Sequence, residues 1–144
     1  MWQQRVARTG ERMRAQVRAE LAATSILLHM SPVIGGLQAL RAAAGAAFEM
    51  ETAADLHRRL KNLPFPSEED VASVAAHDID CARHLVRGRK LAMQAELFLG
   101  LLVTGEHLNQ SIKKMTWGTL ADLLGNATGQ YDAARAALEK LAPV

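Results

Sequence analysis

Alanine and leucine make up about a third of this chain, and this bias constrains its fold more than any motif does. The 144 residues include 26 Ala and 20 Leu, whereas Val and Ile together number only 12. Alanine and leucine are among the strongest helix formers, and sheets draw instead on β-branched and aromatic residues. We therefore expect an all-α fold, an irregular or orthogonal bundle of six to seven helices.

Length, charge and cysteine content limit the number of domains, the class of partner and the cellular compartment that are expected. A single compact domain over 1–144 is expected from the length, with a joint between subdomains at 64–67 as the alternative, because Pro64-Phe65-Pro66-Ser67 interrupts any helix. A net charge of +2 is too small to indicate nucleic acid by itself. The single cysteine, Cys81, cannot form an internal disulfide, and we expect its thiol to be buried. The first residues also lack the pattern of a secretory signal. Both observations predict a cytoplasmic protein.

Apolar spacing and helix breakers give the expected helices of the first half. One helix is expected over 2–30, and Ser31-Pro32 is expected to start a second over 32–49, because serine caps helices and proline fits their first turn. A third is expected over 52–63. The apolar stripe of the first helix consists of Trp2, Val6, Met13, Val17, Leu21, Thr24 and Leu28.

In the second half, one long helix and three shorter ones are expected. Ser67 is expected to cap a single helix that continues to 103, because its apolar stripe passes through 76–79 without a change of phase. The segment 97–103 is apolar on every side, which predicts that it is fully enclosed. Thr104, Thr116 and Thr128 then predict the starts of three further helices, the second of which ends at Gly125.

The segment 21–40 carries no formal charge. This length would suit a membrane span, but polar residues such as His29 and Gln38 interrupt it, so a buried hairpin and no membrane span are expected. Gly35, Ala39 and Ala43 put a small residue at every fourth position within and just after this segment. Such spacing predicts a ridge against which another helix packs closely.

Arginines are concentrated on the first helix. Residues 1–30 contain five Arg against two Glu. Arg5, Arg8 and Arg12 lie one or two turns apart, on the side of the helix away from the apolar stripe. This face is the predicted contact for an acidic partner surface or a phosphate.

The segment 77–84 contains side chains that can bind metal. On a continuous helix, His77, Asp80 and His84 stand one turn apart on one face. Imidazole and carboxylate groups at this spacing are ligands for divalent metals. A metal site here is one hypothesis, and a solvated polar face is the other.

The same segment has an alternative interpretation. Residues 70–78, with the sequence DVASVAAHD, and the following Arg87-Gly88-Arg89 resemble the helix-turn-helix of the lactose-repressor family. The resemblance covers about 20 residues and implies that Asp78 caps a recognition helix and that the apolar positions are filled by Val71, Ala72, Ala75 and Leu85. It further implies that Arg83, Arg87 and Arg89 contact phosphates or bases. A single uninterrupted helix remains the competing prediction.

No catalytic motif or cofactor-binding pattern is found, so we expect neither enzymatic activity nor a cofactor. The function predicted is that of a non-enzymatic helical protein that binds another protein, with a homodimer as one form of this. DNA binding through 70–89 is the first alternative, so nucleic acid remains a second class of partner. A metal- or ligand-binding bundle is the second alternative.

Overall fold

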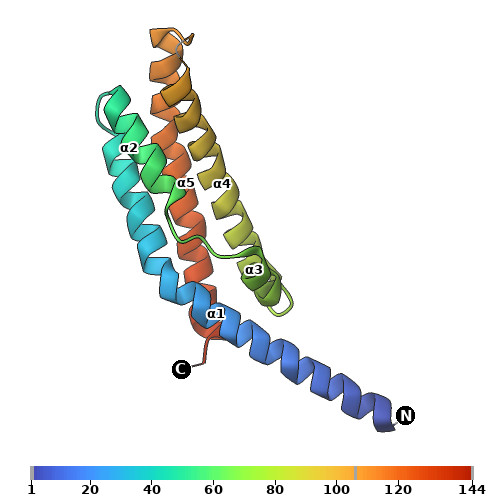
Figure 1. The fold of residues 1–144 in the computed structure, drawn as a ribbon. Helices are drawn as coiled ribbons and strands as arrows, with labels where there is room; N and C mark the ends of the chain where they lie inside the picture. Colours follow the sequence, from blue (N-terminus) through green and yellow to red (C-terminus); the bar gives the residue numbers. More distant parts are fainter. Residues whose placement is uncertain (1, 106, 144) are drawn as a thin grey trace.

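The computed structural model describes residues 2–105 and 107–143, which contain five α-helices and no strand (Figure 1). The helices are α1 (Trp2–Ala44), α2 (Met50–Lys61), α3 (Glu68–Ala75), α4 (Ile79–Thr104) and α5 (Gln110–Leu141). The all-α prediction is confirmed. The predicted number of six to seven helices is wrong, because three expected breaks lie inside longer helices and one real break was not expected.

The three long helices form the body of the molecule. Helix α5 lies between α1 and α4 and packs against both. The shorter α2 and α3 each bridge α1 and α4, α2 near one end of the bundle and α3 near the other (Figure 1). A single apolar core joins all five helices and is built around residues such as Ile26, Leu56, Val74, Leu85 and Leu120.

Helix α1 continues through Pro32, where a break was predicted. Proline has no N–H to donate to the carbonyl of Leu28, and its ring crowds that carbonyl, so it normally bends or ends a helix. Figure 1 shows α1 bent between its protruding N-terminal part and the part inside the bundle. Burial of Met30, Val33 and Leu37 on either side of the proline holds the helix together across it.

The single helix predicted over 67–103 is two helices. Ser67 caps α3 as expected, accepting a hydrogen bond from the Asp70 N–H at 3.1 Å. The chain then turns at 76–78, and Asp78 caps α4 by accepting from the Cys81 N–H at 3.0 Å. The spacing of apolar residues did not indicate this break, because Val74 before the turn and Leu85 after it both face the same core.

Helix α5 is continuous where three helices were predicted. It begins after Asn109, which accepts a hydrogen bond from the Ile112 N–H at 2.9 Å. Thr128 does not cap a new helix, because its hydroxyl donates to the Leu124 carbonyl within the same helix. Gly125 does not end one either. A β-carbon there would lie 2.8 Å from Cζ of Arg41, so this glycine permits a close approach to α1.

Candidate functional site

The N-terminal part of α1 lies outside the bundle. The first buried residue of the helix is Ala19, and no side chain from 2 to 18 is buried. We call residues 2–18 the extension and residues 19–143 the bundle. Figure 1 shows the extension as the part of α1 that projects past the other helices.

The apolar stripe predicted on the first helix faces outward. Trp2 is 77% exposed and Leu28 is 73% exposed, and the intervening large apolar members are exposed as well. We call this set the outer stripe: Trp2, Val6, Met13, Val17, Leu21 and Leu28. At 100° per residue it lies nearly opposite the buried face of α1. An apolar stripe on a helix ordinarily faces a core, so the outer stripe is the strongest sign of an interaction surface.

The arginine face is also exposed. Arg5, Arg8 and Arg12 all lie on the extension, and none forms an ion pair with another described residue. Their angular positions place Arg8 and Arg12 away from the outer stripe, whereas Arg5 lies at its edge beside Trp2 and Val6. The extension is therefore apolar on one side and cationic on the other.

Of the predicted small-residue ridge, only Ala43 packs against the core within the described residues. A β-carbon at Gly35 would have no atom within 4 Å, Ala39 is exposed, and Ala43 is half-buried. The close contact is made by the neighbouring Gly36, against the side chain of Leu63. Neighbouring residues of a helix point 100° apart. Gly35 therefore lies on the face that carries the outer stripe, although Gly36 contacts Leu63.

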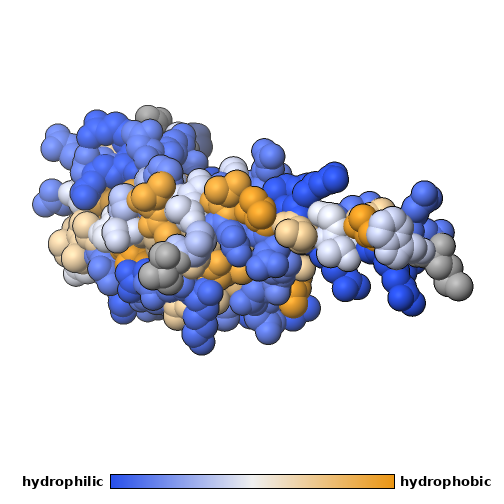
Figure 2. Space-filling model, turned by 90° about the horizontal axis from the view of Figure 1, so that it is seen from below, coloured by the Kyte–Doolittle hydropathy of each residue, from blue (hydrophilic) through white to orange (hydrophobic). Residues whose placement is uncertain are grey.

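A second exposed apolar stripe runs along α4. It consists of Ile79, Val86, Met93, Leu97 and Leu101. The prediction that 97–103 is fully enclosed is therefore wrong: Leu99 and Leu102 face the core, whereas Leu97 is 67% exposed. Figure 2 shows apolar groups on the extension and on the bundle in one view.

The residues of the metal hypothesis do not come together. His77 lies in the turn before α4, Asp80 pairs with Arg83 at 3.3 Å, and His84 is 2.7 Å from the side-chain oxygen of Gln130. Within the described residues, no group of three or more potential ligands could hold a metal ion.

The residues of the helix-turn-helix hypothesis are only partly arranged as expected. Asp78 caps the second helix, and Arg83 and Arg87 are exposed on it. Arg89 turns inward instead, with its guanidinium 4.2 Å from the centre of the Phe65 ring. Of the apolar positions that the resemblance implies, Leu85 is buried but Ala72 is exposed.

Cys81 is buried, as predicted, with its thiol 3.6 Å from the Ala134 carbonyl. Burial and the nearby Asp78 carboxylate raise the pKa of this thiol to about 11, so it is protonated and unreactive near neutral pH.

By length and composition, α1 alone among the described helices is long and apolar enough to cross a membrane. This is weak evidence, since core helices of soluble proteins meet the same criteria and part of this segment is buried in the bundle.

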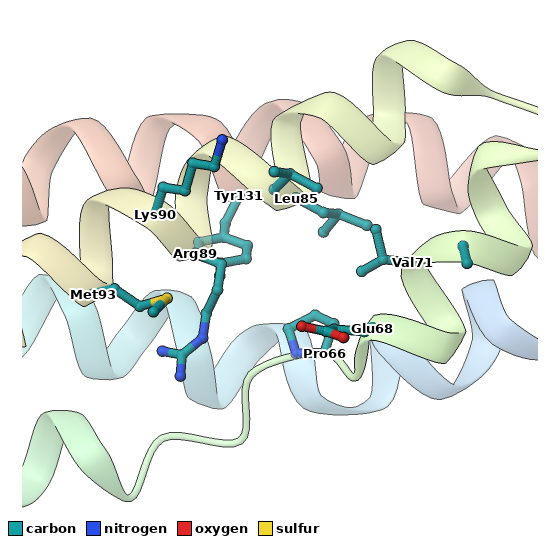
Figure 3. Close-up of a pocket in the computed structure, with 10 residues that line it drawn as sticks. Pro66, Glu68, Val71, Leu85, Arg89, Lys90, Met93 and Tyr131 are labelled. Carbon is teal, nitrogen blue, oxygen red and sulfur yellow. The ribbon is translucent and has the colours of Figure 1, made fainter.

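A pocket of about 410 Å³ lies beside α4, and sequence analysis did not find it. Its walls come from α3, α4, α5 and the segment before α3 (Figure 3). No pattern in the sequence joins these segments, because the lining residues Pro66, Leu85 and Tyr131 are far apart along the chain.

In comparisons with known proteins, no family model, no curated protein and no solved structure matches this chain.

Proposed function

We propose that this protein is a non-enzymatic helical binding protein that pairs with a second copy of itself through the outer face of α1. The observation that carries the proposal is the exposed outer stripe, which continues from the extension onto the bundle. Soluble monomers rarely leave a long apolar strip uncovered. A helix as short as the extension is also marginally stable in water without a packing partner.

The distribution of large and small residues favours an antiparallel pair. If residue i of one copy lies opposite residue 41 − i of the other, Trp2 faces Ala39 and Val6 faces Gly35. In the same register, Met13 faces Leu28 and Val17 faces Thr24. Bulky side chains of the extension thus meet the small-residue ridge, where a β-carbon at Gly35 has open space around it.

The positive charges of the extension are compatible with this antiparallel register. The five arginines of the extension would lie along residues 23–36 of the partner, a segment without formal charge. Arg8 and Arg12 face away from the outer stripe and stay in water, and Arg5 lies at the edge of the stripe. They remain free to attract an acidic surface to the assembled pair.

The first test is the mass in solution, measured by sedimentation over a concentration series. We expect a dimer of the 15.6 kDa chain that dissociates on dilution. The double variant Val6→Gln/Val17→Gln should shift the equilibrium strongly to monomer. Its matched control, Arg8→Gln/Arg12→Gln, introduces the same side chain on the side of the helix away from the outer stripe and should leave the dimer intact. A wild-type protein that is monomeric at every concentration would contradict the proposal.

The second test addresses register, in a Cys81→Ser background. We expect Val6→Cys and Gly35→Cys proteins to form a disulfide-linked dimer when mixed and oxidised. Each variant alone should stay unlinked, because position 6 faces position 35 and not position 6. Efficient linking of the Val6→Cys protein to itself would refute this register.

DNA binding remains a second candidate because of one observation: the turn at 76–78 and the Asp78 cap separate α3 from α4, with Arg83 and Arg87 exposed beyond it. The test is binding to duplex DNA of random sequence across a salt series. Support would be an affinity that falls with salt and weakens further in Arg83→Gln/Arg87→Gln. Weakening only in an Arg5/Arg8/Arg12 triple alanine variant would assign binding to the extension instead.

A further inference from the structure

Two residues that line the pocket beside α4 each have a buried polar atom that lacks a partner. The two atoms are the hydroxyl of Tyr131 and Nη1 of Arg89, neither of which has a hydrogen-bond partner in the described part of the chain. Tyr131 is 0% exposed. More than nine in ten buried polar groups in proteins are hydrogen-bonded, so two unpartnered groups lining one pocket call for an explanation.

Both unpartnered groups are donors. The arginine guanidinium carries a positive charge and can only donate. Burial raises the pKa of the Tyr131 hydroxyl well above its usual value, against a smaller opposing effect of the Arg89 charge, so the phenol keeps its proton. A single ligand group that pairs with both must therefore be an acceptor, because the guanidinium can only donate, and the guanidinium favours one that is negatively charged.

The other residues that line the pocket indicate the polarity, size and charge of the ligand. Val71, Leu85, Val86 and Met93 give the pocket an apolar lining, and its volume of about 410 Å³ is in the range of small-molecule sites. Among its charged residues, Glu68 offsets one of the two positive charges of Arg89 and Lys90. One net positive charge suits a monoanion better than a phosphate with two negative charges.

The position of Tyr131 is fixed by its neighbours. Its ring packs on Gly88 of α4, where a β-carbon would lie 2.8 Å from Cε2 of the tyrosine. The Phe65 ring lies 6.0 Å away, and the same Phe65 ring carries the Arg89 guanidinium on its face. Figure 3 shows Tyr131 and Arg89 on one side of the pocket, with Pro66 and Glu68 across from them. The two donors are thus held in place before any ligand arrives.

From these observations we propose that the pocket binds a small monocarboxylate with an apolar body. The carboxylate accepts hydrogen bonds from the Tyr131 hydroxyl and from Nη1 of Arg89, and the apolar body lies against Val71, Leu85 and Met93. This site is separate from the outer stripe of α1, so its occupancy and the self-association of the chain can be tested independently.

The test is calorimetric titration of the full chain with octanoate, below its micellar concentration, and with octan-1-ol as the neutral analogue. We expect octanoate to bind one site per chain, at least about tenfold more tightly than octan-1-ol. Tyr131→Phe and Arg89→Gln should each weaken octanoate by about tenfold and leave octan-1-ol within about twofold. The control Arg83→Gln removes an exposed arginine outside the pocket on the same helix and should not change either affinity.

A second readout separates ligand binding from folding. Tyr131→Phe removes only a hydroxyl that has no partner, so the ligand-free variant should melt no lower than the wild type. Octanoate should then raise the melting temperature of the wild type but not of the variant. The proposal is overturned if octanoate fails to bind at millimolar concentration, if octan-1-ol binds equally well, or if Tyr131→Phe binds octanoate normally. It is also overturned if the ligand-free variant is clearly less stable, since the hydroxyl would then already have a partner.

Discussion

The extension and the remainder of α1 belong to one helix, but different interactions hold them in that conformation. From Ala19 onward, one face of α1 is buried against α3 and α5, and ten of its residues have almost no exposed surface. Between residues 2 and 18 no side chain is buried, and the hydrogen bonds within the helix are open to water. The bundle part is stabilised by packing, whereas the extension has only local helix propensity within this chain.

In α1, the pattern of apolar residues does not by itself identify which face is buried. In α1 the apolar residues that build the core and those of the outer stripe lie on nearly opposite sides of the same helix. Periodicity reports that an apolar face exists, but it does not report whether the contact lies inside the chain or outside it.

The largest expected difference between the bundle and the extension is in thiol reactivity. Cys81 is buried and its pKa is raised to about 11 by burial and by Asp78, so little thiolate is present at about pH 8. A cysteine placed on the exposed extension, as Ala7→Cys in a Cys81→Ser background, lacks this protection. With a disulfide reagent such as dithionitrobenzoate, we expect Cys81 to react at least about a hundredfold more slowly. Equal rates would mean that α4 is not protected in the bundle.

The same comparison can be made with leucine truncations on α1. Leu37 is fully buried, so Leu37→Ala should lower the free energy of unfolding by about 2–5 kcal/mol. Leu28 is mostly exposed, so Leu28→Ala should change it by less than about 0.5 kcal/mol. Urea unfolding followed by circular dichroism measures both, at a dilution where the chain is monomeric. A large loss in Leu28→Ala under those conditions would place the outer stripe in a core within the chain.

Two adjacent glycines sharpen the contrast between the inner and outer faces. Gly35→Ala adds a methyl group in open space and replaces a poor helix former, so stability should rise by about 0.4–1 kcal/mol. Gly36→Ala drives the new methyl group into the side chain of Leu63. We expect this variant to be less stable than Gly35→Ala by about 1 kcal/mol or more, measured by the same urea unfolding. Equal stabilities would show that Leu63 moves aside without cost.

The smallest expected effect concerns pH. The pKa of His57 in α2 is lowered by burial and next by the Lys61 charge, with Glu96 opposing them. The unfolded chain therefore takes up this proton more readily, so stability is complete above the ordinary imidazole pKa of about 6.5 and falls as the pH drops below it. We expect His57→Asn to reduce this fall in thermal melts between about pH 7 and 5. Deleting residues 2–18, which contain no histidine, should leave the contribution of His57 in place. The same fall in wild type and His57→Asn would contradict the assignment.

Features that depend on neighbouring residues were predictable from the sequence. The helix cap at Ser67 and the break at Pro64–Pro66 follow from backbone chemistry within a few residues, and both are present. Asp78 was expected to act as a cap only on the helix-turn-helix hypothesis, and it does cap α4. Thr128 failed as a predicted cap, because a threonine hydroxyl can equally donate to the carbonyl four residues earlier.

The candidate sites were predictable only in part. The residues of the outer stripe and the arginine face were identified from the sequence, but their exposure was not. The pocket was not predicted at all, because it depends on Tyr131 of α5 meeting Gly88 and Arg89 of α4. Those contacts join residues more than forty positions apart, beyond the reach of any local pattern.

The all-α fold follows from composition alone, because the excess of alanine and leucine favours helices whatever the surroundings. Tertiary structure decided where the helices end and which faces are covered. Burial on both sides of Pro32 outweighs the hydrogen bond that proline loses, so α1 does not break there. Packing against α5 and α3 selects one of the two apolar faces of α1 as core and leaves the outer stripe exposed. Local propensities differ by a fraction of a kcal/mol per residue, whereas burial of a large side chain contributes about 1.5–3 kcal/mol, so packing decides wherever the two compete.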